Sequence, residues 1–243
     1  MKKNYDNYHI IVDDNIHSVI KDALVLKINA HLSANPFFSI ALSGGNTPKK
    51  LYNLLSDELL TWNRIKMFPV DERVVPPDSN GFNWKMIEET FLRYLQEKPL
   101  TFPPLDIHVD PEKSALDLEE TMKRELPVTE EGIPAIDLMI LGVGPDGHSA
   151  SIFPGNSACK EEKRLVMVTE GPPPFDKRLT CTFPLIASAR ERWFLVTGHD
   201  KKEILHKIFK NTDKDLPAWK IAQYVPSLWF LDILSLPEFI WEA

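Results

Sequence analysis

The sequence of 243 residues has few cysteines, no excess of positive charge and no long apolar run. Its two cysteines, Cys159 and Cys181, form neither a CxxC pair nor a regular framework, which argues against a disulfide scaffold and against a structural zinc site. The net charge of -7 argues against nucleic acid as the main partner, because neutralising phosphates requires a basic surface. No segment has the length of a signal-peptide core or a membrane span, so we expect a cytoplasmic protein without a membrane partner.

The composition is that of a folded protein with a sizeable core. Hydrophobic residues make up 43% of the chain and charged residues 26%, which is ordinary for a globular domain. A chain of this length can form one α/β domain, so we predict a single domain over residues 1–243, with a small accessory sub-domain as a possibility.

The hydrophobic pattern alternates between helical and strand-like segments. Helical spacing covers residues 13–34, and helices are also expected from Thr47, with Thr47 as N-cap and Pro48 at the first helical position, over 79–92 and over 111–126. The short, almost wholly apolar runs are typical of strands buried on both faces, and they lie at 37–43, 64–72, 137–144, 164–170, 178–183, 192–198 and 228–232. We therefore predict a doubly wound, mostly parallel sheet with helices on both faces.

The stretch "ALSGGNTPKKLY" predicts an anion site at the junction of a strand and a helix. Ser43, Gly44, Gly45, Asn46 and Thr47 link the two, and glycines let the backbone approach a ligand closely. The N–H groups at a helix N-terminus attract anions, most often phosphate. The Walker pattern is absent, and the alternative is an ordinary tight turn before a capped helix.

Charged residues follow the next strand in "PVDERVVPP". In an open α/β sheet the ligand lies outside the carboxyl ends of the strands, where Asp71 and Arg73 are expected. Asp71 is a candidate acid or base, and Arg73 a candidate clamp for phosphate or for an oxyanion. The alternative is a solvated charge cluster in a loop.

The stretch "DLMILGVGPDGHSASIFPG" contains a G-x-G-x-x-G pattern at Gly142, Gly144 and Gly147. A dinucleotide site requires this pattern early in the chain, with a helix beginning inside it and an acidic residue at the end of the next strand. Here it falls past mid-chain, and the turn carries Asp146 and His148 instead. Among the seven histidines only His148 lies in such a setting, and imidazole suits a general base near neutral pH.

The motifs "SGGNTP", "DER" and "GVGPDGHSASIFPG" together resemble those of the 6-phosphogluconolactonases. The later segments "RLTCTFPLIASARERWFLVTGHDKKEIL" and "LPAW" are similar to that family as well, so the resemblance covers about residues 40–232. It implies hydrolysis of 6-phospho-D-glucono-1,5-lactone in the oxidative pentose phosphate pathway, without metal or organic cofactor. The expected partner is this small phosphorylated lactone, and the protein is a monomer or a small homo-oligomer.

The resemblance also implies roles for the candidate residues. His148 is the expected base that activates water, oriented by Asp146 or by Asp71. The expected phosphate-binding set is Ser43, Gly44, Gly45, Asn46 and Thr47, completed by cations among Arg73, Arg178 and Lys201. Lys177 and Lys202 are adjacent alternatives to Arg178 and Lys201.

Two other functions remain open on the sequence alone. The glucosamine-6-phosphate deaminases resemble this chain in their phosphate loop and their Asp-Gly-His, but they typically follow the histidine with a glutamate that assists ring opening. Here that place reads "SASIFPG" and holds no acid. A non-catalytic sugar-phosphate-binding protein would keep the phosphate loop and lose the base, whereas this chain retains His148.

Overall fold

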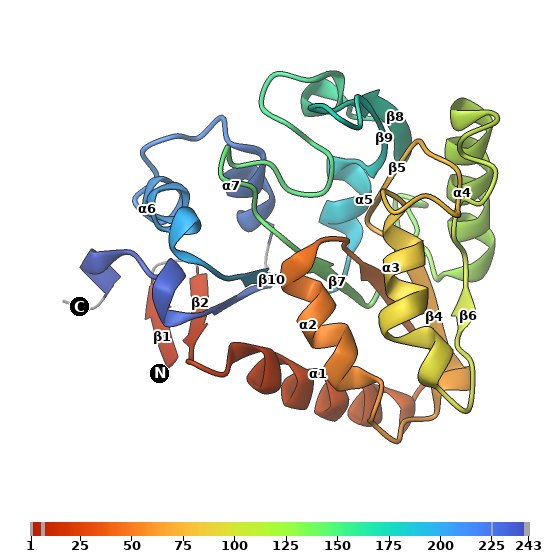
Figure 1. The fold of residues 1–243 in the computed structure, drawn as a ribbon, viewed down its shortest axis with the longest axis horizontal. Helices are drawn as coiled ribbons and strands as arrows, with labels where there is room; N and C mark the ends of the chain where they lie inside the picture. Colours follow the sequence, from red (N-terminus) through yellow and green to blue (C-terminus); the bar gives the residue numbers. More distant parts are fainter. Residues whose placement is uncertain (1, 6–7, 225, 241–243) are drawn as a thin grey trace.

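In a computed structural model, which describes residues 2–5, 8–224 and 226–240, the main sheet has eight strands in the order β1-β2-β11-β10-β7-β3-β4-β6 (Figure 1). The strands of this sheet are β1 Lys2–Tyr5, β2 Tyr8–Val12, β3 Phe38–Leu42, β4 Ile65–Pro69, β6 Leu100–Thr101, β7 Leu138–Leu141, β10 Arg192–Val196 and β11 Ser227–Leu231. All neighbours pair in parallel except β1, which runs antiparallel to β2. The predicted mostly parallel sheet is confirmed.

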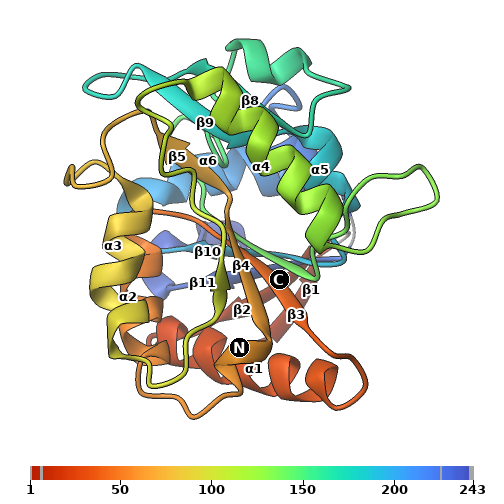
Figure 2. The same ribbon diagram turned by 90° about the vertical axis from the view of Figure 1, so that its right-hand side faces the viewer.

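Helices cover both faces of this sheet. They are α1 Ile16–Leu32, α2 Asn46–Leu55, α3 Asn83–Thr90, α4 Pro111–Glu125, α5 Phe183–Ser188, α6 Lys202–Phe209 and α7 Pro217–Ala222. The chain proceeds from β2 through β3 and β4 to β6 in one direction along the sheet, and from β7 through β10 to β11 in the other. Because crossovers are right-handed, this reversal places α1, α2 and α3 on one face and α4 and α5 on the opposite one (Figure 2).

A second, antiparallel sheet of three strands lies beyond the carboxyl end of β4 (Figure 1). It contains β5 Asp71–Arg73, β8 Val166–Glu170 and β9 Lys177–Cys181 in the order β5-β9-β8. The sequence-based placement of the strands at 164–170 and 178–183 in the parallel sheet is therefore wrong. Only residues 171–176 join β8 to β9, and a parallel pair needs a crossover of a dozen or more residues. The run at 64–72 likewise divides at Val70 between the two sheets.

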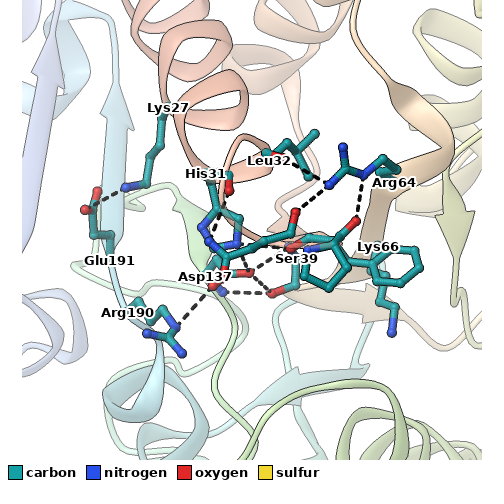
Figure 3. A network of polar contacts seen from close by, with 12 residues as sticks. Lys27, His31, Leu32, Ser39, Arg64, Lys66, Asp137, Arg190 and Glu191 are labelled. Carbon is teal, nitrogen blue, oxygen red and sulfur yellow. Dashed lines mark hydrogen bonds and ion pairs between the residues drawn. The ribbon is translucent and has the colours of Figure 1, made fainter.

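A polar network fastens the amino ends of β3 and β7 (Figure 3). Asp137 is buried, and its Oδ2 accepts hydrogen bonds from the backbone N–H of Ser39 at 2.9 Å and from the Ser39 hydroxyl at 2.7 Å. The Ser39 hydroxyl in turn accepts the N–H of Asp137 at 2.9 Å, and Arg190 Nε lies 3.1 Å from Asp137 Oδ1. This reciprocal pair joins two neighbouring strands at the end opposite to the cleft described below.

We expect Asp137→Ala to destabilise the fold but to leave the activity of the folded protein unchanged. The substitution leaves the buried N–H and hydroxyl of Ser39 without their acceptor, which should lower the free energy of unfolding by about 2–4 kcal/mol. Urea denaturation followed by circular dichroism measures this change. A loss below about 1 kcal/mol would mean that water replaces the carboxylate at no cost.

Candidate active site

A cleft opens at the carboxyl ends of β3 and β7, where the winding direction of the sheet reverses. Such a switch point is the usual ligand crevice of doubly wound folds. The cleft has a volume of about 310 Å³. Its lining includes ten of the eleven residues singled out by sequence, namely Ser43, Gly44, Gly45, Asn46, Thr47, Asp71, Arg73, His148, Arg178 and Lys201. The eleventh, Asp146, does not line the cleft, but its carboxylate contacts the imidazole of His148, which does.

The loop after β3 turns directly into α2. The helix begins at Asn46, with Gly45 as its N-cap at a φ of 104°, so the expected N-cap at Thr47 is wrong, and Pro48 is the third helical residue instead of the first. The positive φ of glycine lets the chain enter the helix two residues earlier than a Thr cap would. The Thr47 hydroxyl instead lies 3.0 Å from that of Thr197, just after β10. Asn46, Thr47 and Pro48, the first residues of α2, line the cleft, and the N–H groups at the start of a helix have no partner within the helix.

Two contacts explain why the loop holds this shape. The Ser43 hydroxyl donates to the carbonyl oxygen of Ile140 at 2.8 Å, which ties the loop to β7. At Gly44 a Cβ atom would stand 1.9 Å from Oδ1 of Asn83, so only glycine leaves room for that side chain. Asn83 also lines the cleft and was not identified from the sequence.

His148 lies in the loop after β7, and its ring contacts Asp146 and Phe153. Its Nδ1 lies 2.6 Å from Oδ1 of Asp146, and the same oxygen accepts the backbone N–H of His148 at 3.2 Å. Although partial burial opposes the charge, these hydrogen bonds from His148 hold the pKa of Asp146 below its usual value. A carboxylate only accepts, so Nδ1 carries the hydrogen and Nε2 is left as the proton acceptor. The ring of Phe153 packs on the imidazole with centroids 4.3 Å apart.

The turn at His148 is not a dinucleotide loop. The structure begins no helix inside the Gly142–Gly144–Gly147 pattern, and the next helical residues start at Ser157. Gly147 has a φ of 84°, and a Cβ at Gly144 would stand 2.1 Å from the imidazole ring. These glycines therefore serve to bring the histidine close to its own loop.

Asp71, the other carboxylate considered for His148, has a different partner. Its Oδ2 accepts the hydroxyl of Ser151 at 2.6 Å, and its side chain is buried. Ser151 and Phe153 belong to the motif that follows His148, and both line the cleft. Of the two alternatives, Asp146 is the one that contacts the ring.

Two arginines lie side by side on neighbouring strands of the small sheet. Arg73 on β5 pairs in register with Arg178 on β9, and both guanidinium groups lie over the ring of Phe175, at 5.4 and 5.7 Å from its centroid. Burial, followed by the charge of Arg73, lowers the pKa of Arg178. Two like charges held together at a cleft are relieved by an anion, so this pair adds a second anion-binding element to the start of α2.

Of the three lysines considered for the site, only Lys201 lines the cleft. Its Nζ lies 3.1 Å from a carboxylate oxygen of Asp200. Lys202 instead bonds Glu238 at 2.9 Å and is absent from the lining, as is the exposed Lys177. Within residues 2–5, 8–224 and 226–240 there is no group of three His, Cys, Asp or Glu side chains placed to hold a metal ion, and no helix long and apolar enough to cross a membrane.

The chain is similar to known proteins along most of its length. Residues 13–229 match the family described as glucosamine-6-phosphate isomerases/6-phosphogluconolactonase. The chain is 38% identical to the 6-phosphogluconolactonase of Synechocystis sp. over 199 residues, which cover 80% of this chain and 81% of that one. It is 35% identical to 6-phosphogluconolactonase 3, chloroplastic, of Arabidopsis thaliana over 80% of this chain, but the match covers only 63% of that longer protein.

The fold is similar to that of solved members. The structure of the 6-phosphogluconolactonase from Trypanosoma cruzi superposes with a TM-score of 0.84 at 33% identity, and the match covers 96% of this chain and 97% of that one.

Proposed function

Because this chain belongs to the glucosamine-6-phosphate isomerase/6-phosphogluconolactonase family, we propose that it hydrolyses 6-phospho-D-glucono-1,5-lactone to 6-phospho-D-gluconate, the lactonase step of the oxidative pentose phosphate pathway. The observation that carries the proposal is the 2.6 Å contact between His148 and Asp146 at the rim of a cleft that also holds two paired arginines. It combines one oriented base with anion-binding groups, which is what lactone hydrolysis requires.

The reaction needs a base, a water and a group that stabilises negative charge. Nε2 of His148 takes a proton from water while the water oxygen bonds to the lactone carbon C1. The resulting oxyanion on the former carbonyl oxygen is stabilised by Arg73 or Arg178. When the bond from C1 to the ring oxygen breaks, that oxygen receives the proton from the His148 imidazolium and leaves as a hydroxyl. Asp146 keeps the ring oriented and stabilises its charged form between the two steps.

The substrate phosphate fits the loop at the start of α2. Gly44, Gly45 and Asn46 offer backbone N–H groups with the positive end of the helix behind them, and Lys201 lies at the same cleft. A phosphate fixed there positions C1 against the water that His148 activates.

We expect Gly44→Ala to weaken the binding of 6-phosphogluconate by about 1.5–3 kcal/mol, the scale of losing charge-assisted hydrogen bonds. Its Cβ cannot coexist with the present position of the Asn83 side chain, so either the loop or Asn83 must move. Titration calorimetry measures the change. Gly132→Ala is the control for a glycine replaced outside the cleft, because no atom lies within 4 Å of a Cβ at Gly132 and this residue does not line the cleft. Equal affinities for the wild type and Gly44→Ala would place the phosphate elsewhere.

The function itself is tested with 6-phosphogluconolactone generated in place by a dehydrogenase. The purified protein should remove it far faster than spontaneous hydrolysis does, as followed by the rate of 6-phosphogluconate formation. A rate equal to the spontaneous one would refute the proposal. Binding of 6-phosphogluconate without turnover would instead favour a sugar-phosphate-binding protein.

A further inference from the structure

One buried carboxylate beside the cleft has no part in the proposed chemistry. Glu72 is the middle residue of β5, and it is fully buried, whereas its neighbours Asp71 and Arg73 line the cleft. Successive strand residues point to opposite faces, so the Glu72 side chain turns away from the substrate. In the described part of the chain no cation stands within ion-pair distance of it. Burial raises the pKa of Glu72, and the backbone hydrogen bonds that its oxygens accept oppose this shift.

The partners of Glu72 are backbone N–H groups on two separate elements. Oε1 accepts from the N–H of Arg73 at 2.7 Å and of Asn83 at 2.6 Å, and Oε2 accepts from that of Trp84 at 2.8 Å. Asn83 and Trp84 are the first two residues of α3, and the N-cap residue Phe82 supplies no side-chain acceptor. The Glu72 side chain, which extends from β5, therefore caps the N-terminus of α3 and joins that helix to the strand.

Both elements that Glu72 joins present a side chain to the cleft. Arg73 extends from β5, and its Nη1 donates to the carbonyl oxygen of Gly81, in the loop that leads to α3. From the helix, the Asn83 side chain reaches back, donates to the carbonyl oxygen of Asp71 at 3.2 Å and lies against Gly44. A shift of α3 relative to β5 would thus move a candidate oxyanion group and the packing of the phosphate loop together.

We propose that Glu72 is a positioning residue, whose carboxylate fixes α3 to β5 and thereby sets where Arg73 and Asn83 face the substrate. The inference rests on the proposed function for its catalytic readout. Glu72→Gln keeps the shape of the side chain but replaces one acceptor oxygen by an NH₂ group, which cannot accept an N–H. The change should therefore remove the single contact of Oε2 or the two contacts of Oε1, with little loss of packing.

The test is a double-mutant cycle of Glu72→Gln with Arg73→Ala, read as kcat and KM for the lactone. Glu72→Gln alone should lower kcat/KM at least tenfold in folded protein, and less than threefold when Arg73 is already alanine. Asp137→Ala serves as the control for lost stability, because it removes a buried carboxylate at the opposite end of the sheet and should retain turnover. Equal losses in both Arg73 backgrounds, or wild-type turnover in Glu72→Gln, would overturn the inference.

Two further outcomes are covered by the same set of proteins. If Glu72→Gln does not fold, Glu72→Asp replaces it in the cycle, since it keeps the charge and shortens the reach by one methylene group. Failure of both variants to fold would assign Glu72 to folding alone and overturn the inference. If the wild type has no lactonase activity, the proposed function fails separately, and the cycle is read as the dissociation constant for inorganic phosphate. An unchanged constant in Glu72→Gln would then count against positioning.

Discussion

His148→Ala should lower the turnover of 6-phosphogluconolactone by about 10²–10⁴-fold, the usual contribution of a general base. The imidazole is the group that Asp146 orients, and Phe153 packs against it, so its removal takes away the proton acceptor that the proposal assigns to the attacking water. The loss should appear in kcat, because the phosphate loop after β3 does not depend on the histidine. Binding of 6-phosphogluconate should stay within a few-fold of wild type.

The measurement is a steady-state assay corrected for spontaneous hydrolysis, with His108→Ala as the matched control. His108 is exposed and does not line the cleft, so this variant should retain full activity. If His148→Ala retains more than about a tenth of the turnover, the loss is smaller than removal of a general base usually causes. That result would assign the role of base to another residue.

Sequence patterns predicted the main sheet because its central strands are almost wholly apolar. The runs at β3, β7 and β10 are buried along their length and that at β11 at every position but Leu228, and such runs occur where helices cover both faces. The same reasoning placed β8 and β9 in that sheet wrongly, because their burial also produces apolar runs. What distinguishes them is the short connection through residues 171–176, which only an antiparallel pair can accommodate.

The small elements at the edges of the sheet left no comparable signal. Strand β2 pairs with β11 from a segment whose second residue is the exposed His9, and β6 is only two residues long within a proline-rich stretch. Pairing of such strands depends on the neighbour that the fold supplies, which local propensity does not encode. The helices α5, α6 and α7 have six to eight residues each, too few to establish a period.

The residues from Ser43 to Thr47, together with His148 and Lys201, line the cleft because they follow the carboxyl ends of the parallel strands β3, β7 and β10. Asp71, Arg73 and Arg178 reach the cleft from the small antiparallel sheet, and Asp146 contacts His148 without lining the cleft. Asn83 and Glu72 were missed for a physical reason. Asn83 is placed by the packing of α3 against Gly44, and Glu72 acts through backbone N–H groups that any residue would offer. Their importance depends on tertiary contacts between segments ten or more residues apart.

The substrate phosphate should control the rate on lactones. Two charge-assisted hydrogen bonds to the phosphate are worth about 3 kcal/mol, which corresponds to about a hundredfold in rate when that binding energy positions the reacting carbon. We therefore expect kcat/KM for 6-phosphogluconolactone to exceed that for unphosphorylated gluconolactone by at least about a hundredfold. Gly44→Ala should reduce this ratio, since it disturbs the loop that holds the phosphate and leaves His148 in place.

The same assays distinguish the lactonase from the deaminase chemistry of its family. Release of ammonia from glucosamine 6-phosphate requires ring opening and proton transfer between C2 and C1, and thus at least two acid-base groups near the sugar. After His148 the chain places the buried Ser149, then Ala150, and then Ser151, whose hydroxyl is bonded to Asp71. The segment after His148 itself carries no carboxylate, so ammonia release should not exceed the rate without protein. Substantial ammonia release would refute this interpretation, and so would equal rates on the two lactones.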